Sequence, residues 1–188
     1  AAVDPNFKMP QVWKTSFAID YAFPTSFPFT ITAEGIFNKT INGVSISDWS
    51  IKPVEGFTRF NGADNRPIYQ DGFRNTTKAF VLENTSKGYG WSANVSMNMR
   101  PIKELELMAS YTHTVSKEVT GLPGSNAESA FTYVPTVNGP NNIALHNSEY
   151  VTPNRVLAGA TFHKKNSHFS LIYEAWNGGY NYSYMTTN

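Results

Sequence analysis

The sequence predicts an all-β protein, an antiparallel up-and-down meander of about six long strands. Three observations carry this prediction. Apolar and polar residues alternate through several runs of about ten residues, because successive side chains of a strand face opposite sides. Pro, Gly, Asn and Ser cluster between these runs, as is typical of turns and loops. No window keeps apolar residues at the helical spacing i, i+3, i+4 and i+7 over three turns.

The clearest alternation lies in residues 91–115, where two runs flank Pro101. Apolar residues share one face of each run: Trp91, Ala93, Val95, Met97 and Met99 in the first, and Leu105, Leu107, Ala109 and Tyr111 in the second. The few residues around Pro101 allow only a tight connection. The two runs are therefore predicted to pair as an antiparallel hairpin.

Two further hairpins are predicted, over about residues 12–38 and about residues 155–176. Short polar or proline-rich turns, at 24–28 and 164–167, join the two runs of each. Long connections over about 39–90 and 116–154 separate the three hairpins, and short strand pieces are expected in the first, near 44–51 and 78–83. The last of these is predicted either to extend the strand that begins near Trp91 or to form a small hairpin with it.

The composition and the pattern of strands and loops indicate that the apolar strand faces contact membrane lipid. Charged residues make up only 15% of the chain and aromatic residues 14%, whereas soluble domains average about 25% charged residues. Each run has the 9–11 residues that a tilted strand needs to cross a bilayer. Short turns alternate with long loops, and aromatic residues gather near strand ends, as in outer-membrane barrels. The whole chain, 1–188, is thus predicted to be a fragment of a transmembrane β-barrel, since complete single-chain bacterial barrels begin at eight strands.

Several classes of function are disfavoured by the same composition. A net charge of +1, from 15 basic and 14 acidic residues, gives no reason to expect nucleic acid as a partner. The absence of cysteine excludes disulfides and thiolate metal sites. No catalytic motif is found, so the chain is predicted not to be an enzyme and to hold no cofactor and no metal.

Two polar segments contain possible metal ligands but are predicted to be turns. His163 and His168 flank the turn at 164–167, and two solvated histidines are favoured over a metal pair. The segment 61–67, which contains Asp64, lacks the spaced acidic ligands of a calcium loop.

Three carboxylates project from the polar faces of predicted strands: Asp20, Glu34 and Glu106. They come from different strands and have no nearby histidine or serine partner for acid–base chemistry. We expect them to line a wet surface or to pair across strands with Lys14 or Arg100.

Three segments together resemble a known family. They are DPNFKMPQVWKTSFAIDY from Asp4, ENTSKGYGWSANVSMNMR from Glu83 followed by LMASYTHTVSKE from Leu107, and the terminal LIYEAWNGGYNYSYMTTN. In order and spacing the chain resembles the C-terminal barrel region of TonB-dependent outer-membrane receptors, in the branch that carries an N-terminal carboxypeptidase-regulatory-like domain and a plug.

The resemblance implies a location in the outer membrane of a Gram-negative cell and contact with membrane lipid. The whole receptor would import a nutrient, such as a siderophore, a glycan or a peptide, and would use the TonB complex through its N-terminal part. No plug domain is found in these 188 residues, so this segment alone is not expected to transport. Its open strand edges are expected to favour self-association.

Ligand contacts are expected from the long loops and the polar strand faces. The candidate residues are Trp49, Tyr69, Arg74, Phe131 and Tyr133. Two alternatives remain open: a soluble extracellular β-sandwich that binds carbohydrate through Trp49, Tyr150 and Trp176, and a surface adhesion protein without a small ligand.

Overall fold

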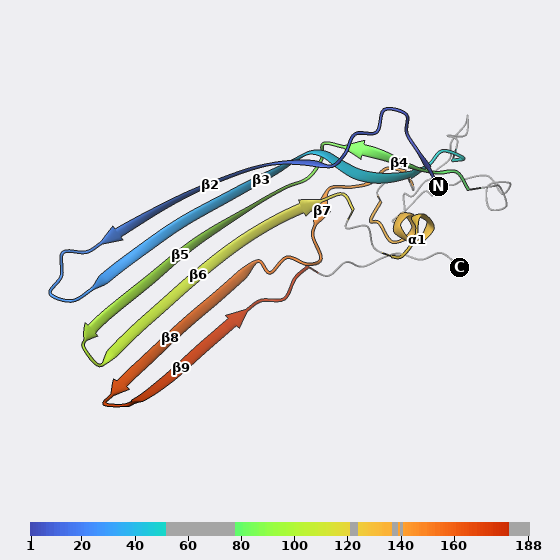
Figure 1. Ribbon diagram of the computed structural model, residues 1–188. Coiled ribbons are helices and arrows are strands. Elements are labelled where there is room, and N and C mark those ends of the chain that lie inside the picture. The colour runs from blue at the N-terminus through green and yellow to red at the C-terminus, as the bar shows by residue number, and fades with distance from the viewer. Residues whose placement is uncertain (52–77, 121–123, 137–138, 140, 181–188) are drawn as a thin grey trace, which may run out of the picture. The chain divides into compact units, whose positions relative to one another are not determined.

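The structure is a computed structural model that describes residues 1–51, 78–120, 124–136, 139 and 141–180. In this part of the chain the protein is all-β, with nine strands and one short helix (Figure 1). The sheet is mostly antiparallel, and its described strands do not close into a barrel. The predicted all-β, antiparallel architecture is confirmed.

The elements follow one another along the chain as β1 Ala2–Val3, β2 Gln11–Ala22, β3 Phe29–Asp48, β4 Phe80–Thr85, β5 Tyr89–Ile102, β6 Leu105–Glu118, α1 Ala127–Thr132, β7 His146–Asn147, β8 Asn154–Lys164 and β9 Ser167–Trp176. The strand order in the sheet is β1-β4-β3-β5-β6-β8-β9, with β2 beside β3 and β7 beside β6. The chain divides into two compact units, and β3 contributes to both.

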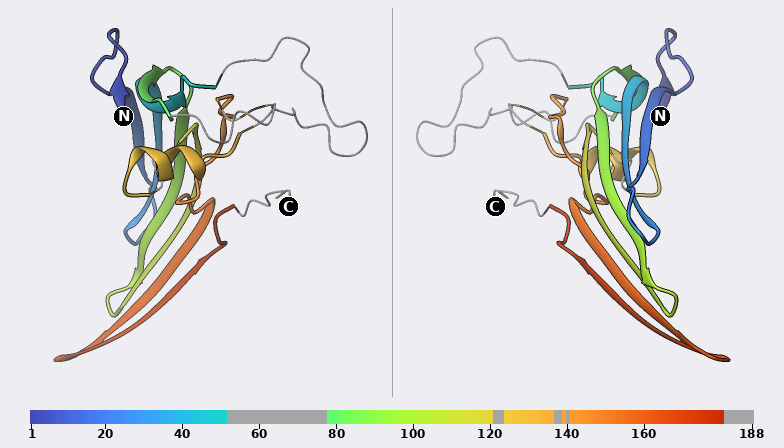
Figure 2. Two further views of the ribbon diagram at one scale, coloured as in Figure 1. Left: turned by 90° about the vertical axis from the view of Figure 1, so that its right-hand side faces the viewer. Right: turned by 90° about the vertical axis from the view of Figure 1, so that its left-hand side faces the viewer.

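The first unit, called the meander unit here, consists of Trp13–Lys39, Tyr89–Ser116 and Asn147–Asn188. Strands β2, β3, β5, β6, β8 and β9 neighbour one another in the order in which they occur along the chain. Figures 1 and 2 show these strands side by side in a single layer. The pairs β2–β3, β5–β6 and β8–β9 correspond to the three predicted hairpins.

The register of the meander unit separates its two faces. Apolar residues lie opposite apolar ones, as in the pair Ala33 and Val95, and polar residues lie opposite polar ones, as in Thr32 and Ser96. Cross-strand hydrogen bonds join the polar side: Thr32 Oγ1 to Asp20 Oδ1 (2.5 Å), Asn94 Nδ2 to Ser110 Oγ (2.9 Å), Ser92 Oγ to Thr114 Oγ1 (3.2 Å) and Thr161 Oγ1 to Ser170 Oγ (3.0 Å). The side chains of this face therefore bond one another across strands.

The apolar face of the meander unit has no layer packed on it in the described part of the chain. Phe17 is 71% exposed, Leu171 74% and Val95 52%. Among the described residues of this unit, Val151 is the one buried residue with a branched aliphatic or aromatic side chain, and Pro153 is buried near it in the sequence. Within the ranges that the structure describes, these strands therefore gain little of the hydrophobic effect from a core of their own.

The second unit, called the loop unit here, consists of Ala1–Val12, Thr40–Gly88 and Lys117–His146. Strand β4 pairs antiparallel with the last part of β3, from Gly43↔Thr85 to Asp48↔Phe80, and parallel with β1. A small core contains Ile46, Val81, Val119, Ala130 and Val134. This unit thus has the buried apolar centre that the meander unit lacks.

Three details of the loop unit differ from the sequence-based predictions. Strand β3 continues to Asp48 instead of ending near residue 38. Strand β4 pairs with β3 and β1, not with β5. Helix α1 was not predicted, because six residues are too few to display helical periodicity. Its capping box, in which Asn126 and Ser129 each bond the other's backbone N–H, was the available signal.

Gly88 makes the connection from β4 to β5 possible. Its φ is +117°, a conformation that side chains with a Cβ rarely adopt, and a Cβ here would lie 2.9 Å from Thr40 Oγ1. Its carbonyl accepts a hydrogen bond from the Thr40 N–H at 3.1 Å. The segment KGYG, residues 87–90, therefore needs glycine at position 88 to make this turn.

Candidate functional site

The meander unit carries an open hollow of about 640 Å³ where the polar side meets the 148–152 segment. Its wall consists of hydroxyl, charged and aromatic side chains: Thr112, Thr114, Ser116, Ser148, Tyr150, Thr152, Arg155, Glu174 and Trp176, with Val151. Strands β6, β8 and β9 supply the floor, because their alternate residues project to one side. The hollow is large enough for a small polar molecule or one end of a larger one.

An ion pair crosses this hollow between two neighbouring strands. Arg155 Nε donates to Glu174 Oε1 at 2.7 Å, and Arg155 Nη2 lies 2.5 Å from the same oxygen. The register places Arg155 opposite Trp176 and Glu174 opposite Leu157, so the pair is diagonal. Because both donors use one carboxylate oxygen, the other oxygen and the remaining guanidinium N–H groups are available to a ligand.

Two aromatic side chains, Tyr150 and Trp176, line the same hollow as the ion pair. Tyr150 is 82% exposed and Trp176 is 61% exposed. Exposed rings beside charged groups and hydroxyls provide flat apolar surfaces with polar groups at their edges. Such a surface suits a polar ligand with apolar faces, for example a sugar ring or a peptide.

The threonines of the hollow are held in place from the neighbouring strand. Thr112 Oγ1 accepts from Asn94 Nδ2 at 2.8 Å, and Thr114 Oγ1 lies 3.2 Å from Ser92 Oγ. These bonds fix the hydroxyl groups on β6 before any ligand arrives. The hollow is therefore a pre-formed polar surface.

The predicted ligand-contacting residues lie elsewhere or outside the described residues. Trp49, Phe131 and Tyr133 belong to the loop unit, and Tyr69 and Arg74 are not among the described residues. The indole N–H of Trp49 donates to Glu83. The Phe131 ring packs against Phe80 at a centroid distance of 5.3 Å, and Tyr133 is exposed after α1.

Sequence reasoning found part of the hollow and missed the rest. Tyr150 and Trp176 were named for the carbohydrate alternative, and the structure brings them to one hollow, whereas Trp49 belongs to the other unit. Arg155 and Glu174 were not named. Their signal was two opposite charges near the loop-side ends of consecutive strands.

A second polar cluster of interest holds the end of β3 to the start of β4 in the loop unit. The buried carboxylate of Asp48 accepts from Ser50 N (2.9 Å), Ser50 Oγ (2.6 Å) and Ala79 N (3.0 Å). The Asp48 backbone is bonded twice by the Asn141 side chain, each time at 2.8 Å. This network joins the end of β3 and Ser50 to Ala79, which directly precedes β4.

The pKa of Asp48 reflects this environment. Burial raises its pKa, but hydrogen bonds from the Ser50 hydroxyl, Ala79 N–H and Ser50 N–H, together with the charge of Lys78, outweigh burial. The net result is a pKa below the ordinary value of 3.8. Asp48 is therefore a structural carboxylate, ionised wherever the protein is near neutral pH.

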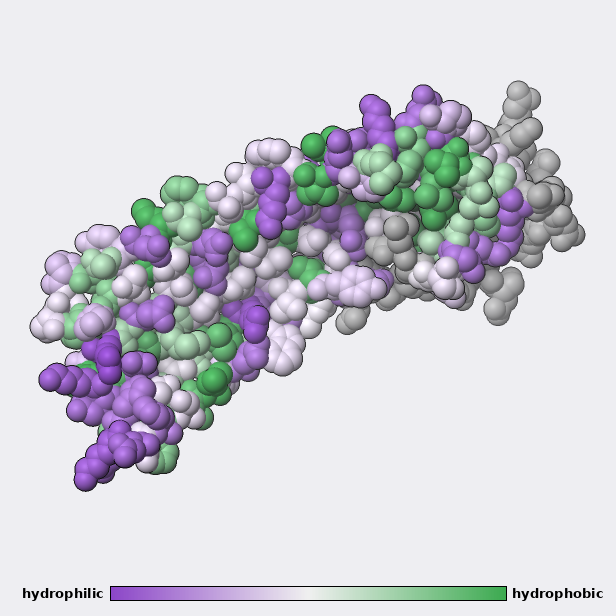
Figure 3. All heavy atoms as spheres, viewed as in Figure 1, coloured by the Kyte–Doolittle hydropathy of each residue, from purple (hydrophilic) through white to green (hydrophobic). Residues whose placement is uncertain are grey.

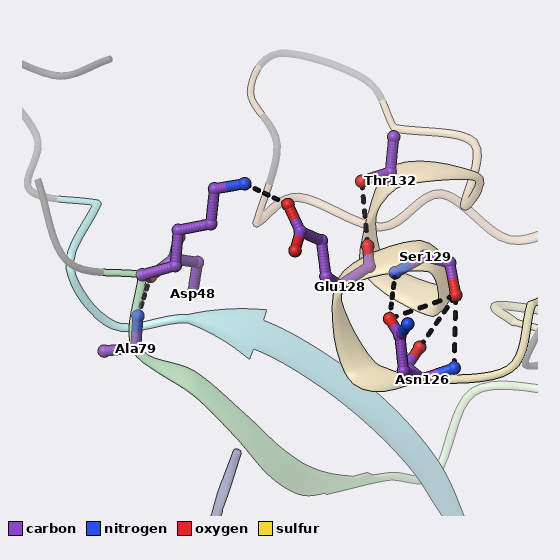
Figure 4. A network of polar contacts seen from close by, with 7 residues as sticks. Asp48, Ala79, Asn126, Glu128, Ser129 and Thr132 are labelled. Carbon is purple, nitrogen blue, oxygen red and sulfur yellow. Dashed lines mark hydrogen bonds and ion pairs between the residues drawn. The ribbon is translucent and has the colours of Figure 1, made fainter. Parts of the chain in front are cut away.

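Helix α1 lies next to this cluster, as Figure 4 shows. Lys78 forms an ion pair with Glu128 in the first turn of α1. At the start of the helix, Asn126 Oδ1 accepts from Ser129 N at 2.9 Å. The cluster joins β3, β4 and α1 within the loop unit through hydrogen bonds and an ion pair.

Within the described ranges, no group of three or more His, Cys, Asp or Glu side chains is arranged to hold a metal ion. Asp64 lies outside these ranges. Of the two alternatives expected for the strand carboxylates, Glu106 shows the cross-strand pairing, with Oε1 at 3.6 Å from Arg100 Nη1. The expectation that no histidine lies near these carboxylates is wrong for Glu106, because β8 pairs beside β6 and brings His163 Nε2 to 3.5 Å from Glu106 Oε2. Of the helices in the described chain, none has the length and apolar character needed to cross a membrane.

Comparison with known proteins gives no family assignment: no family model, no curated protein and no solved structure matches this chain.

Proposed function

We propose that this chain is part of the wall of a TonB-dependent outer-membrane receptor, whose whole barrel imports a nutrient such as a siderophore, a glycan or a peptide. One observation carries the proposal. The exposed apolar face of the meander unit is bounded at both ends by aromatic clusters, as the lipid-facing surface of an outer-membrane barrel is.

The first cluster lies at the turn between β2 and β3. Tyr21 and Phe23 meet edge to face at 4.7 Å, and Phe23 stacks on Phe29 at 4.4 Å. The second cluster lies at the other end of the same strands, where Trp13 meets Phe37 at 6.0 Å. Between the clusters this face is mainly apolar and carries Phe17 and Ile19 on β2 and Ile31 and Ala33 on β3, as expected for side chains in contact with acyl chains.

The distance between the clusters fits a bilayer. Phe29 and Phe37 enclose a stretch of β3 that counts nine residues with both ends, and a tilted strand crosses the hydrocarbon region in about 9–11 residues. Tyr21 and Trp13 enclose a stretch of the same length on β2. The apolar band between the aromatic residues therefore has the same length on both strands.

The polar side would line the interior of the barrel. Its hydrogen-bonded Ser, Thr and Asn side chains tolerate water, and the hollow around Arg155 and Glu174 offers a place where a nutrient makes contact. A soluble sandwich would instead seal the apolar face beneath a second sheet. The exposure of Phe17 and Val95 favours lipid over such a core.

Single-cysteine labelling of the whole receptor in its native membrane tests the proposal. The natural chain has no cysteine, so the described segment adds no background. We compare Phe17→Cys with Ser16→Cys, and Leu171→Cys with Ser170→Cys. Each pair contains neighbours that face opposite sides of one strand.

We expect a water-soluble maleimide to modify the cysteines at 16 and 170 and to leave those at 17 and 171 unmodified. A fluorophore at 17 or 171 should be quenched by spin-labelled lipid. Aqueous labelling of 17 and 171 at the rate of their neighbours contradicts the proposal. Protection without quenching by lipid would indicate the sealed core of a sandwich.

A further inference from the structure

Two histidines face each other at the turn between β8 and β9. His163 and His168 are directly opposite in the register, one pair before the last pair of the hairpin, Lys164 and Ser167. Their Nδ1 atoms lie 2.6 Å apart, and the ring planes are at 81°. Hydrophilic side chains gather at this end of the meander unit (Figure 3).

The short distance between the two rings and the nearby carboxylate of Glu106 determine which ring nitrogens carry a proton. Two Nδ1 atoms at 2.6 Å cannot both carry a proton, because the hydrogens would collide. Nε2 of His163 is buried, has no hydrogen-bond partner, and lies 3.5 Å from Glu106 Oε2. The carboxylate favours the tautomer that keeps the proton on Nε2, so the lone pair of His163 Nδ1 points at His168.

We propose that His163 and His168 form a two-imidazole site for a divalent transition-metal ion of the imidazole-preferring class, Cu²⁺, Ni²⁺ or Zn²⁺. Imidazole nitrogen lies about 2.0–2.1 Å from such an ion, which places two neighbouring ligand nitrogens about 2.9 Å apart at a square-planar ion and about 3.3–3.4 Å apart at a tetrahedral one. The two Nδ1 atoms are 2.6 Å apart, so the rings need to separate by about 0.3–0.8 Å and to turn both lone pairs toward the ion. Water completes the coordination, since His168 is exposed.

Glu106 is a positioning residue in this site. A carboxylate behind a ligating histidine fixes its tautomer and ring orientation and raises its basicity. Arg100 shares Glu106, at 3.6 Å, and Lys164 and Lys165 occupy the same turn. These positive charges lower the affinity for a cation, so binding is expected to be weaker than at a closed four-ligand zinc site.

The proposal does not rest on the membrane assignment, because the register and the three side chains are the same in any solvent. The site also differs from the hollow around Arg155, which lies at the other end of β8.

Titration of the full chain in detergent micelles with CuCl₂, followed by electron paramagnetic resonance, tests the site. We expect one bound Cu²⁺ whose spectrum shows two imidazole nitrogens. His163→Asn and His168→Asn should each leave one nitrogen and weaken binding at least tenfold. Glu106→Gln should keep two nitrogens and weaken binding by about 10-fold or more.

His113→Asn and His146→Asn are the matched controls, since they remove the other two histidines of the chain. Both should bind Cu²⁺ as the natural chain does. The proposal is overturned if the natural chain shows fewer than two nitrogen ligands, a result that needs no variant. It is also overturned if the variants at 163 and 168 bind like the controls.

Discussion

At the scale of single residues, Asp48 is the side chain whose loss should cost most in the loop unit. Its carboxylate satisfies the N–H groups of Ser50 and Ala79, and Asp48→Ala leaves both without this acceptor. We expect a loss of about 1–3 kcal/mol in the free energy of unfolding. Urea denaturation of the full chain in detergent measures it, and Asp48→Asn, which keeps one carbonyl oxygen, should lose less.

The same residue predicts a dependence on pH. The pKa of Asp48 is lower in the folded protein than its ordinary value of 3.8. Its contribution is therefore complete above that value and is lost as pH falls through the folded pKa. The stability difference between the natural chain and Asp48→Asn should shrink as the pH is lowered below about 4. A difference that stays constant to lower pH would show that the charge of Asp48 contributes nothing.

The ion pair between Arg155 and Glu174, unlike the Asp48 carboxylate, should contribute little to the stability of the protein. Both side chains are partly exposed, 55% and 39%, and pairs of this kind contribute about 0.2–1 kcal/mol in double-mutant cycles. We expect Arg155→Ala, Glu174→Ala and the double variant to give a coupling within that range. A coupling well above it would mean that the pair is structural and not a surface available to a ligand.

At the scale of elements, the turn between β8 and β9 has one strained residue. Lys165 has a φ of 52°, and a non-glycine residue in this region costs about 1–2 kcal/mol. Lys165→Gly removes that cost. Glycine, however, makes the unfolded chain more flexible, which lowers the stability of the folded state by about 0.5–1 kcal/mol. The net expectation is a gain of about 0.5–1 kcal/mol in urea denaturation.

Lys164→Gly is the matched control for this turn, because Lys164 ends β8 in extended backbone. The same substitution there has no strain to relieve and should destabilise the hairpin. Equal effects at 164 and 165 would contradict the assignment of strain to Lys165.

The elements also explain how far the sequence could predict this structure. Strands of ten or more residues showed their period of two, so β2, β5, β6, β8 and β9 were found close to their observed bounds. Strands of two residues, such as β1 and β7, have no period to detect. The partner of β4 was not predictable either, since pairing depends on register and not on the strand's own pattern.

Recognition of the candidate site had the same limit. Tyr150 and Trp176 could be named as exposed aromatic residues one at a time. The hollow exists only because the β8–β9 register places Arg155 opposite Trp176 and diagonally beside Glu174. The proximity of His163 and His168 was more predictable, since both flank a four-residue polar turn between two alternating runs. Their direct contact, in contrast to the expected pair of solvated histidines, depends on the register of β8 and β9.

At the scale of the whole molecule, the two units place their apolar residues in different surroundings. The loop unit buries a core of its own, while the meander unit exposes residues such as Phe17 and Leu171. A sheet exposed in this way would aggregate in water, because its face and its edges invite association. The exposure of this face is therefore the feature on which the receptor proposal rests.

A pair of lysine substitutions on β5 measures which solvent covers the face. Val95 lies in the aliphatic band opposite Ala33, and Ser96 lies on the polar side opposite Thr32. In a bilayer, lysine on the lipid side near the midplane costs about 2–4 kcal/mol, whereas substitutions on the interior side cost little. Folding of the whole receptor into phospholipid vesicles, followed by guanidinium denaturation, should therefore show a large loss for Val95→Lys and a small one for Ser96→Lys. If both variants lose less than about 0.5 kcal/mol, as surface changes in water do, the apolar face meets water and the receptor proposal fails.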